Sequence, residues 1–256
     1  MLKFSGSLRD YPFILSFDLA KNVAGWSLVD TRDDTYTVLD CDIIDMSKYS
    51  KEDFWLEYKK RLIDVFVRTR YTLHALFGVN DATILVTKEK LPSQAGVTST
   101  IATLQALAKV HAVFELALDE IIARDPLRTL FLPYDKTCPC GIEHKETENG
   151  VHAASVKALF RKIIGIDKPT KQDIREAVSK ICRGKDVSSL KEDISDSIAV
   201  TITLKEVKFN ADIDEDRKAL RKKIRSLKSE SAKALYAEEL KRLESLKLPP
   251  SSYEKV

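Results

Sequence analysis

The run Phe13-Ile14-Leu15-Ser16-Phe17-Asp18 decides the fold, together with Gly25-Trp26-Ser27-Leu28-Val29-Asp30, which follows the turn Lys21-Asn22-Val23. Both runs are short, apolar and bounded by polar residues, which indicates the two strands of a hairpin. A third stretch, from Thr35 to Ile44, is rich in β-branched and apolar residues. These three stretches predict an antiparallel meander of three strands.

Helices and further strands follow in alternation. Residues 50–77 and 98–123 carry apolar side chains at helical spacing. The apolar run from Thr83 to Thr87 predicts a buried fourth strand, and Leu130-Phe131-Leu132 before Pro133 predicts a fifth. This order predicts an α/β fold in which helices flank a mixed five-stranded sheet.

The second half of the chain has a different character. A polar insertion spans 134–152, and helices are predicted at 153–164, 170–182 and 188–208. Residues 212–248 are rich in Lys, Arg, Glu, Ala and Leu and contain no Gly or Pro, which indicates one long charged helix or a helix pair. We therefore expect a domain over 1–209 and a charged helical tail over 210–256.

Composition narrows the class of protein. The chain has 256 residues, of which 44% are hydrophobic and 32% charged, with 8 Gly and 8 Pro, so a collagen-like or wholly disordered chain is excluded. We expect no membrane span and no signal peptide, because no long apolar run is evident. Four cysteines do not make a disulfide framework, so we expect an intracellular, cytoplasmic-type reducing compartment. Net charge is +3, and the positive excess lies in the second half of the chain, which could contact phosphates.

Four acidic residues occupy unusual places in this pattern. Asp18 closes the first strand and Glu89 follows the fourth, while Asp193 and Asp196 are spaced i,i+3 on one face of a helix. Taken singly, each acid can be explained without a function, as a turn residue, a surface acid or a residue at a helix N-terminus. Parallel pairing of the first and fourth strands would bring Asp18 and Glu89 to one sheet edge, where the helix could add the other two.

Convergence of these carboxylates predicts a metal site. Four carboxylates without a compensating Lys or Arg would repel one another and raise each pKa. Mg²⁺ or Mn²⁺ relieves that repulsion, because hard cations prefer oxygen ligands. Two such ions can activate water and stabilise the leaving oxygen in phosphodiester hydrolysis.

The motifs resemble those of the RuvC-type Holliday-junction resolvases in the RNase H-like superfamily. The segment from Phe17 to Trp26 is similar to the family's first strand and hairpin, and Leu85-Val86-Thr87-Lys88-Glu89 resembles the strand that ends in its catalytic Glu. Asp193-Ile194-Ser195-Asp196-Ser197-Ile198-Ala199 resembles its closing Asp-x-x-Asp-Ala-x-Ala motif, and Val156-Lys157-Ala158-Leu159 resembles its basic stretch. Two departures from the family motifs stand out. Leu19-Ala20 follows Asp18 where the family has Pro-Gly, and Ser197 follows Asp196 where the family has Ala. This divergence suits a phage, viral or organellar member.

The resemblance implies a magnesium-dependent crossover-junction endodeoxyribonuclease of DNA recombination and repair. A homodimer would bind a four-way DNA junction and nick opposed strands symmetrically, with the helix over 98–123 at the dimer interface. Asp18, Glu89, Asp193 and Asp196 would be the catalytic residues and the ligands of two Mg²⁺ or Mn²⁺ ions. The lysines expected to contact DNA are Lys157, Lys171, Lys88 and Lys21.

Other functions stay open from the sequence. The chain could be a related nuclease acting on flaps, branched DNA or RNA–DNA hybrids, or an inactive junction-binding scaffold. Cys138, Cys140 and His144 have the residue types of a zinc site, but the C-x-C spacing is unusual and a loop with free thiols is the simpler interpretation. The charged tail could pair as a helical hairpin or lie on DNA.

Overall fold

The first three predicted strands and both helical segments form where the apolar spacing places them. The computed structural model of the chain describes residues 12–32, 36–49, 52–78, 83–91, 100–124, 130–133, 150–185 and 191–227, with residues 229, 233, 234, 236–238, 240 and 241 beyond them. The strands are β1 (Phe13–Asp18), β2 (Val23–Asp30), β3 (Tyr36–Asp45), β4 (Thr83–Lys88), β5 (Leu130–Pro133) and β6 (Cys182–Gly184). The helices are α1 (Phe54–Phe77), α2 (Ile101–Arg124), α3 (Ala153–Ile164), α4 (Lys171–Ile181) and α5 (Glu192–Ser226).

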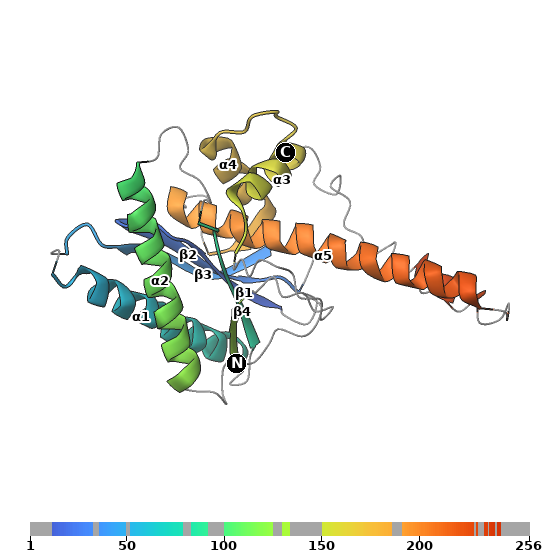
Figure 1. Cartoon of the computed structure of the whole chain (residues 1–256), viewed down its shortest axis with the longest axis horizontal. Coiled ribbons are helices and arrows are strands. Elements are labelled where there is room, and N and C mark those ends of the chain that lie inside the picture. Colours follow the sequence, from blue (N-terminus) through green and yellow to red (C-terminus); the bar gives the residue numbers. More distant parts are fainter. Residues whose placement is uncertain are drawn as a thin grey trace.

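The strands form one mixed sheet in the order β5-β4-β1-β2-β3-β6 (Figure 1). β1, β2 and β3 make the antiparallel meander, and β4 pairs in parallel with the free side of β1. β5 continues in parallel beside β4. This order and these directions are those of the RNase H-like fold, so the predicted fold class is confirmed. The short strand β6, parallel to β3 at the opposite edge, was not predicted.

Helices cover both faces of the sheet, α1 and α2 on one face and α3, α4 and α5 on the other (Figure 1). Phe13, Leu15 and Phe17 of β1 belong to the core that packs under α1 and α2, whereas Ile14 belongs to the core under α3, α4 and α5. The alternation follows from the two-residue repeat of a strand, which sends successive side chains to opposite faces. Because both faces are covered, the strands read as continuous apolar runs in the sequence.

Helix α5 is the longest element in the described part of the chain. Its 35 residues extend about 52 Å at 1.5 Å per residue. The first half packs on the sheet through residues such as Ile198 and Ile202, and the second half projects beyond it (Figure 1). The helix runs without a break through 209–210, where the sequence analysis placed a boundary.

The chain beyond α5 folds back. Lys223 Nζ lies 4.4 Å from the ring centroid of Tyr236, and residues on both sides of Tyr236 are helical. A straight helix would separate these two residues by about 20 Å. Of the two forms expected for the tail, the structure therefore shows the helix pair.

Helix α2 corrects the expectation that no segment is apolar enough to cross a membrane. By length and composition Ile101–Arg124 passes that test, with a mean hydropathy of 1.4 over 18 residues, of which 22% are buried. Val110, Phe114 and Leu118 pack into the core that α2 shares with α1 and the sheet. One helix of this kind is weak evidence for a membrane span, because helices in protein cores can pass the same composition test.

Candidate active site at the sheet edge

Strands β1 and β4 bring Asp18 and Glu89 to the same end of the sheet, where the carboxyl ends of these two parallel strands lie side by side. Phe17 and Lys88 are register partners in this parallel pair, and the Glu89 amide donates a 2.9 Å hydrogen bond to the Phe17 carbonyl oxygen. Side chains alternate along each strand, so Asp18 shares a face with Ile14, and Glu89 shares one with Leu85. Ile14 and Leu85 both pack toward α5. The two carboxylates therefore emerge together on the α5 face.

The first turn of α5 approaches this edge because Gly25 has no side chain. Gly25 is the β2 partner of Asp18, and a Cβ atom on it would lie 1.9 Å from the carbonyl oxygen of Asp193. The backbone of α5 therefore packs directly on β2, beside Asp18. Asp196 follows one turn later on the same face of the helix.

A buried network of hydroxyl groups fixes α5 in this position. Ser16 Oγ donates to the Ser197 carbonyl oxygen at 2.7 Å and lies 2.9 Å from Ser27 Oγ. Ser197 Oγ lies 3.0 Å from Ser27 Oγ, and Thr201 Oγ1 donates to Ser16 Oγ at 2.7 Å. All four side chains are buried. This network accounts for Ser197 at a position where the resembling motif has Ala, and the only signal in the sequence was two serines inside apolar strands.

The acidic groups act on one another electrostatically. Burial, followed by the charges of Glu89 and Asp196 with a smaller contribution from Asp193, raises the pKa of Asp18 to about 7. Burial and the charge of Asp196 also raise the pKa of Glu89, and burial raises that of Asp196. Asp18 thus lies close enough to each of the other three predicted acids for its pKa to be raised by their charges. Their mutual repulsion favours binding of a cation.

Lysines predicted to contact DNA take three different positions. Lys171 Nζ lies 2.6 Å from Glu192 Oε1 and 3.1 Å from Asp196 Oδ2, so its ammonium group offsets the acidic set directly. Lys157 is exposed on α3, and its charge lowers the pKa of Glu89 against the effect of burial. Lys21 is exposed in the turn after β1. Lys171 and Lys157 therefore act on the acidic residues, whereas the contact of Lys21 is with the Phe54 ring of α1.

Lys88 does not lie with them. Its side chain points to the opposite face of the sheet, is 5% exposed, and pairs with Glu115 of α2. Its Nζ also sits 4.8 Å from the Phe114 ring centroid. The predicted DNA contact of Lys88 therefore does not fit the structure, because the alternation that exposes Glu89 turns Lys88 inward.

Asp18, Glu89, Asp193 and Asp196 have the chemistry of a site for Mg²⁺ or Mn²⁺. All four offer carboxylate oxygens, the ligands that hard divalent cations prefer, and a cation would relieve the crowding that raises the pKa of Asp18. Within the described ranges, no group of three or more His, Cys, Asp or Glu side chains lies close enough together to hold a metal ion, so binding would require these side chains to move closer. The suggested zinc ligands Cys138, Cys140 and His144 lie outside the described residues.

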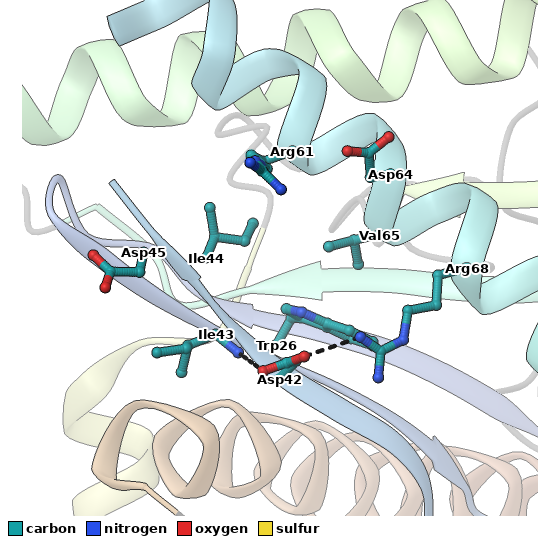
Figure 2. Close-up of a pocket in the computed structure, with 9 residues that line it drawn as sticks. All are labelled: Trp26, Asp42, Ile43, Ile44, Asp45, Arg61, Asp64, Val65 and Arg68. Atoms are coloured by element: carbon teal, nitrogen blue, oxygen red, sulfur yellow. Dashed lines mark hydrogen bonds and ion pairs between the residues drawn. The ribbon is translucent and has the colours of Figure 1, made fainter. Parts of the chain in front are cut away.

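A cavity of about 330 Å³ lies on the other face of the sheet, between β2, β3 and α1 (Figure 2). Trp26 forms its floor, and Arg68 extends from α1 to bind Asp42 at 2.9 Å. Arg68 also binds the buried carboxylate of Asp40 at 2.6 Å. These ion pairs fasten α1 to β3, and we assign this cavity a structural role separate from the carboxylate site.

Comparison with known proteins gives similarities in three-dimensional structure alone. No protein-family model and no curated protein sequence matches the chain. Among solved structures, Thermus thermophilus RuvC in complex with a Holliday junction is 10% identical with a TM-score of 0.44, covering 75% of this chain and 92% of that chain. The yeast mitochondrial Holliday junction resolvase Ydc2 is 12% identical with a TM-score of 0.43, covering 78% and 79%. The human cytomegalovirus terminase nuclease domain is 11% identical with a TM-score of 0.44, covering 79% and 89%. The fold assignment rests on strand order and direction, and these similarities assign no activity to this chain.

Proposed function

We propose that this protein is a metal-dependent nuclease that hydrolyses phosphodiester bonds in DNA. The observation that supports the proposal is that burial and the charges of Glu89, Asp196 and Asp193 raise the pKa of Asp18, at the end of β1, to about 7. In such a site the ionised carboxylates repel one another, and a bound divalent cation would offset that repulsion.

Each acidic residue has a defined part in this proposal. Asp18 and Glu89 would hold the ions from the rigid sheet, and Asp193 and Asp196 would complete the site from α5. Two bound Mg²⁺ or Mn²⁺ ions supply an activated water and charge stabilisation at the leaving oxygen. Lys171 positions Asp196, and Lys157 offers its charge to phosphates at the rim.

We further propose that the substrate is a four-way DNA junction cut by a homodimer. Sequence motifs similar to those of the RuvC-type resolvases support this substrate, and a two-fold enzyme matches a pseudo-symmetric junction. Helix α2 offers an interface, because Ile101 and Leu116 are large apolar side chains left exposed on it. The nuclease domain would span 1–209, and the charged tail over 210–256 would assist binding.

Cleavage of a synthetic four-way junction with Mg²⁺ or Mn²⁺ tests the proposal. We expect paired nicks on opposed strands, and a loss of roughly 10²–10³-fold or more in Asp18→Asn with junction binding retained. Asp64→Asn is the matched control, since Asp64 lines the cavity on the opposite face. Equal cleavage by wild type and Asp18→Asn would contradict the proposed site. Preferential cleavage of a flap or an RNA–DNA hybrid would support a nuclease with a different substrate. Tight junction binding without cleavage would indicate an inactive junction-binding scaffold protein.

A further inference from the structure

A second cavity opens at the same end of the sheet as the carboxylate site, on the opposite face, which α1 covers. It measures about 420 Å³, within the range of about 300–1,000 Å³ typical of small-molecule sites. It lies between the turn after β1, the end of β3 and the first turn of α1. The residues that shape it are Met46 and Phe54 at the bottom, Tyr49 and Trp55 at the sides, and Lys21 and Asn22 at the rim.

The aromatic walls of this cavity are held in place before any ligand binds. The ring centroids of Phe54 and Trp55 are 4.9 Å apart in an edge-to-face arrangement. Arg61 donates a 2.5 Å hydrogen bond to the Tyr49 hydroxyl and lies over the ring of Tyr49. Phe54 is buried, while Trp55 and Tyr49 keep part of their surface accessible. Fixed aromatic faces of this kind are stacking surfaces for nucleobases.

A cation stands at the mouth of the cavity. Lys21 Nζ lies 5.9 Å from the Phe54 ring centroid, and the rest of its side chain is exposed. A base that entered the cavity would bring its own phosphate to this rim, where an ammonium group is the complementary charge. The combination of aromatic walls and one peripheral lysine fits a nucleotide better than an uncharged apolar ligand.

The backbone ties this cavity to the carboxylate site. Lys21 follows Asp18 by three residues, so their Cα atoms lie within about 11 Å, the length of about three nucleotides at about 3.4 Å each along a B-form strand. The Tyr58 hydroxyl donates to the Ala20 carbonyl oxygen at 3.0 Å, and the Met46 amide donates to the Asn22 carbonyl oxygen at 2.7 Å. These hydrogen bonds hold the turn in a fixed relation to Asp18.

We propose that this cavity receives one unpaired nucleobase of the DNA strand being cut, stacked on Trp55, with the adjoining phosphate at Lys21. The proposal rests on DNA being the substrate of the carboxylate site, and it adds a basis for selecting that substrate. A base inside an intact duplex is stacked on both faces and paired with its partner, so it cannot enter the cavity without unstacking and unpairing. Branch points and frayed ends supply an unpaired base at low cost, so the cavity would favour branched DNA over linear duplex.

Intrinsic fluorescence provides a test that does not depend on cleavage. The chain has two tryptophans, and Trp26 is 1% exposed, so a stacked base would quench Trp55 selectively. With Asp18→Asn as the background, we expect a junction with an unpaired base at its centre to quench the emission. Trp55→Leu should remove the quenching and weaken binding about 10-fold or more. Leu56→Ala, at the exposed neighbour on α1, is the control and should change neither.

Abasic substrates test the same contact without changing the protein. Removing one base at a time around the cleavage position should leave a single position at which wild-type binding falls about 10-fold or more. Trp55→Leu should show no further loss at that position, because the two changes remove one interaction. Lys21→Ala should lower the slope of log K against log salt by about one unit.

The outcomes separate this inference from the proposed nuclease. Cleavage by wild type with a flat abasic series and unaltered binding by Trp55→Leu overturns the cavity assignment and leaves the nuclease intact. Binding and quenching without cleavage supports the cavity and overturns the nuclease. A chain that neither binds nor cuts any of these DNAs overturns both.

Discussion

Gly25 is the residue on which the whole site depends sterically. A Cβ atom at this position would meet the Asp193 carbonyl oxygen at 1.9 Å and the following amide nitrogen at 2.7 Å, both of them backbone atoms. Gly25→Ala should therefore push the first turn of α5 off β2. We expect a loss of about 3 kcal/mol in the free energy of unfolding, measured by urea titration, and loss of cleavage. Ala24→Gly, which adds no atoms beside α5, is the control for changing this strand. An unaltered stability in Gly25→Ala would show that α5 sits farther from β2.

Ionised Asp18 is predicted to lower the free energy of unfolding when no metal ion is bound. Its pKa is raised to about 7, so the folded protein keeps a proton that the unfolded chain has already released. Stability should then fall as the pH rises from about 4 to about 7. Asp18→Asn should reduce this slope in metal-free buffer, leaving the smaller contributions of Glu89 and Asp196, and raise stability at pH 8 by roughly 2–4 kcal/mol.

Thermal unfolding in EDTA and in Mg²⁺ measures this effect. The wild type should gain stability when Mg²⁺ is added, because the ion binds the folded state, whereas Asp18→Asn should gain much less. Equal melting temperatures for the two proteins in EDTA at pH 8 would indicate that Asp18 is not under electrostatic strain.

At the scale of elements, α2 presents the clearest unpaired surface. Leu116 is 58% exposed, while Val110 and Phe114 on the same helix are buried in the core. If α2 forms the proposed dimer interface, Leu116→Glu should convert the dimer to a monomer in sedimentation equilibrium, since it buries a charge between apolar surfaces. Leu76→Glu, at an exposed leucine on α1, should leave the dimer unaffected. A monomeric wild type would refute the interface.

The sequence predicts the elements well where the apolar pattern is long or where topology constrains it. The strand ends at Asp18 and Glu89 were found because each apolar run stops there, and parallel pairing then fixes their meeting. The short strand β6 was missed, since three residues following α4 carry no periodicity. The inward orientation of Lys88 was also missed. It depends on which face of β4 packs on α2, and a lysine next to a predicted catalytic acid looked exposed.

The hydroxyl network shows a different limit of sequence reasoning. Ser16, Ser27 and Thr201 come from segments far apart in the chain, and their partnership exists only after α5 has packed on the sheet. No local pattern reveals such a contact. Likewise, the pairing of Lys171 with Glu192 and Asp196 arises from the packing of α4 against the start of α5.

At the scale of the whole molecule, the tail is joined to the site by one continuous helix. The described side chains of its outer part include the exposed cations Lys218, Arg221, Lys222, Lys223 and Arg225. If the tail contacts DNA, truncation after Asn210 should weaken junction binding and reduce its salt dependence, because fewer counterions are released. Fluorescence anisotropy across a range of salt concentrations measures both quantities. An unchanged slope would exclude this role, and retained cleavage by the truncated chain would verify that its core is folded.

The continuity of α5 also has a mechanical consequence. The inner half of the helix is fixed to the sheet from its first turn, where the Asp193 backbone packs on Gly25, to Leu204. The charged outer turns continue the same helix without a break. A helix has a fixed rise of about 1.5 Å per residue, so the outer turns stand at a set distance from Asp193 and Asp196. Any molecule that binds the outer turns is therefore held at that distance from the two carboxylates.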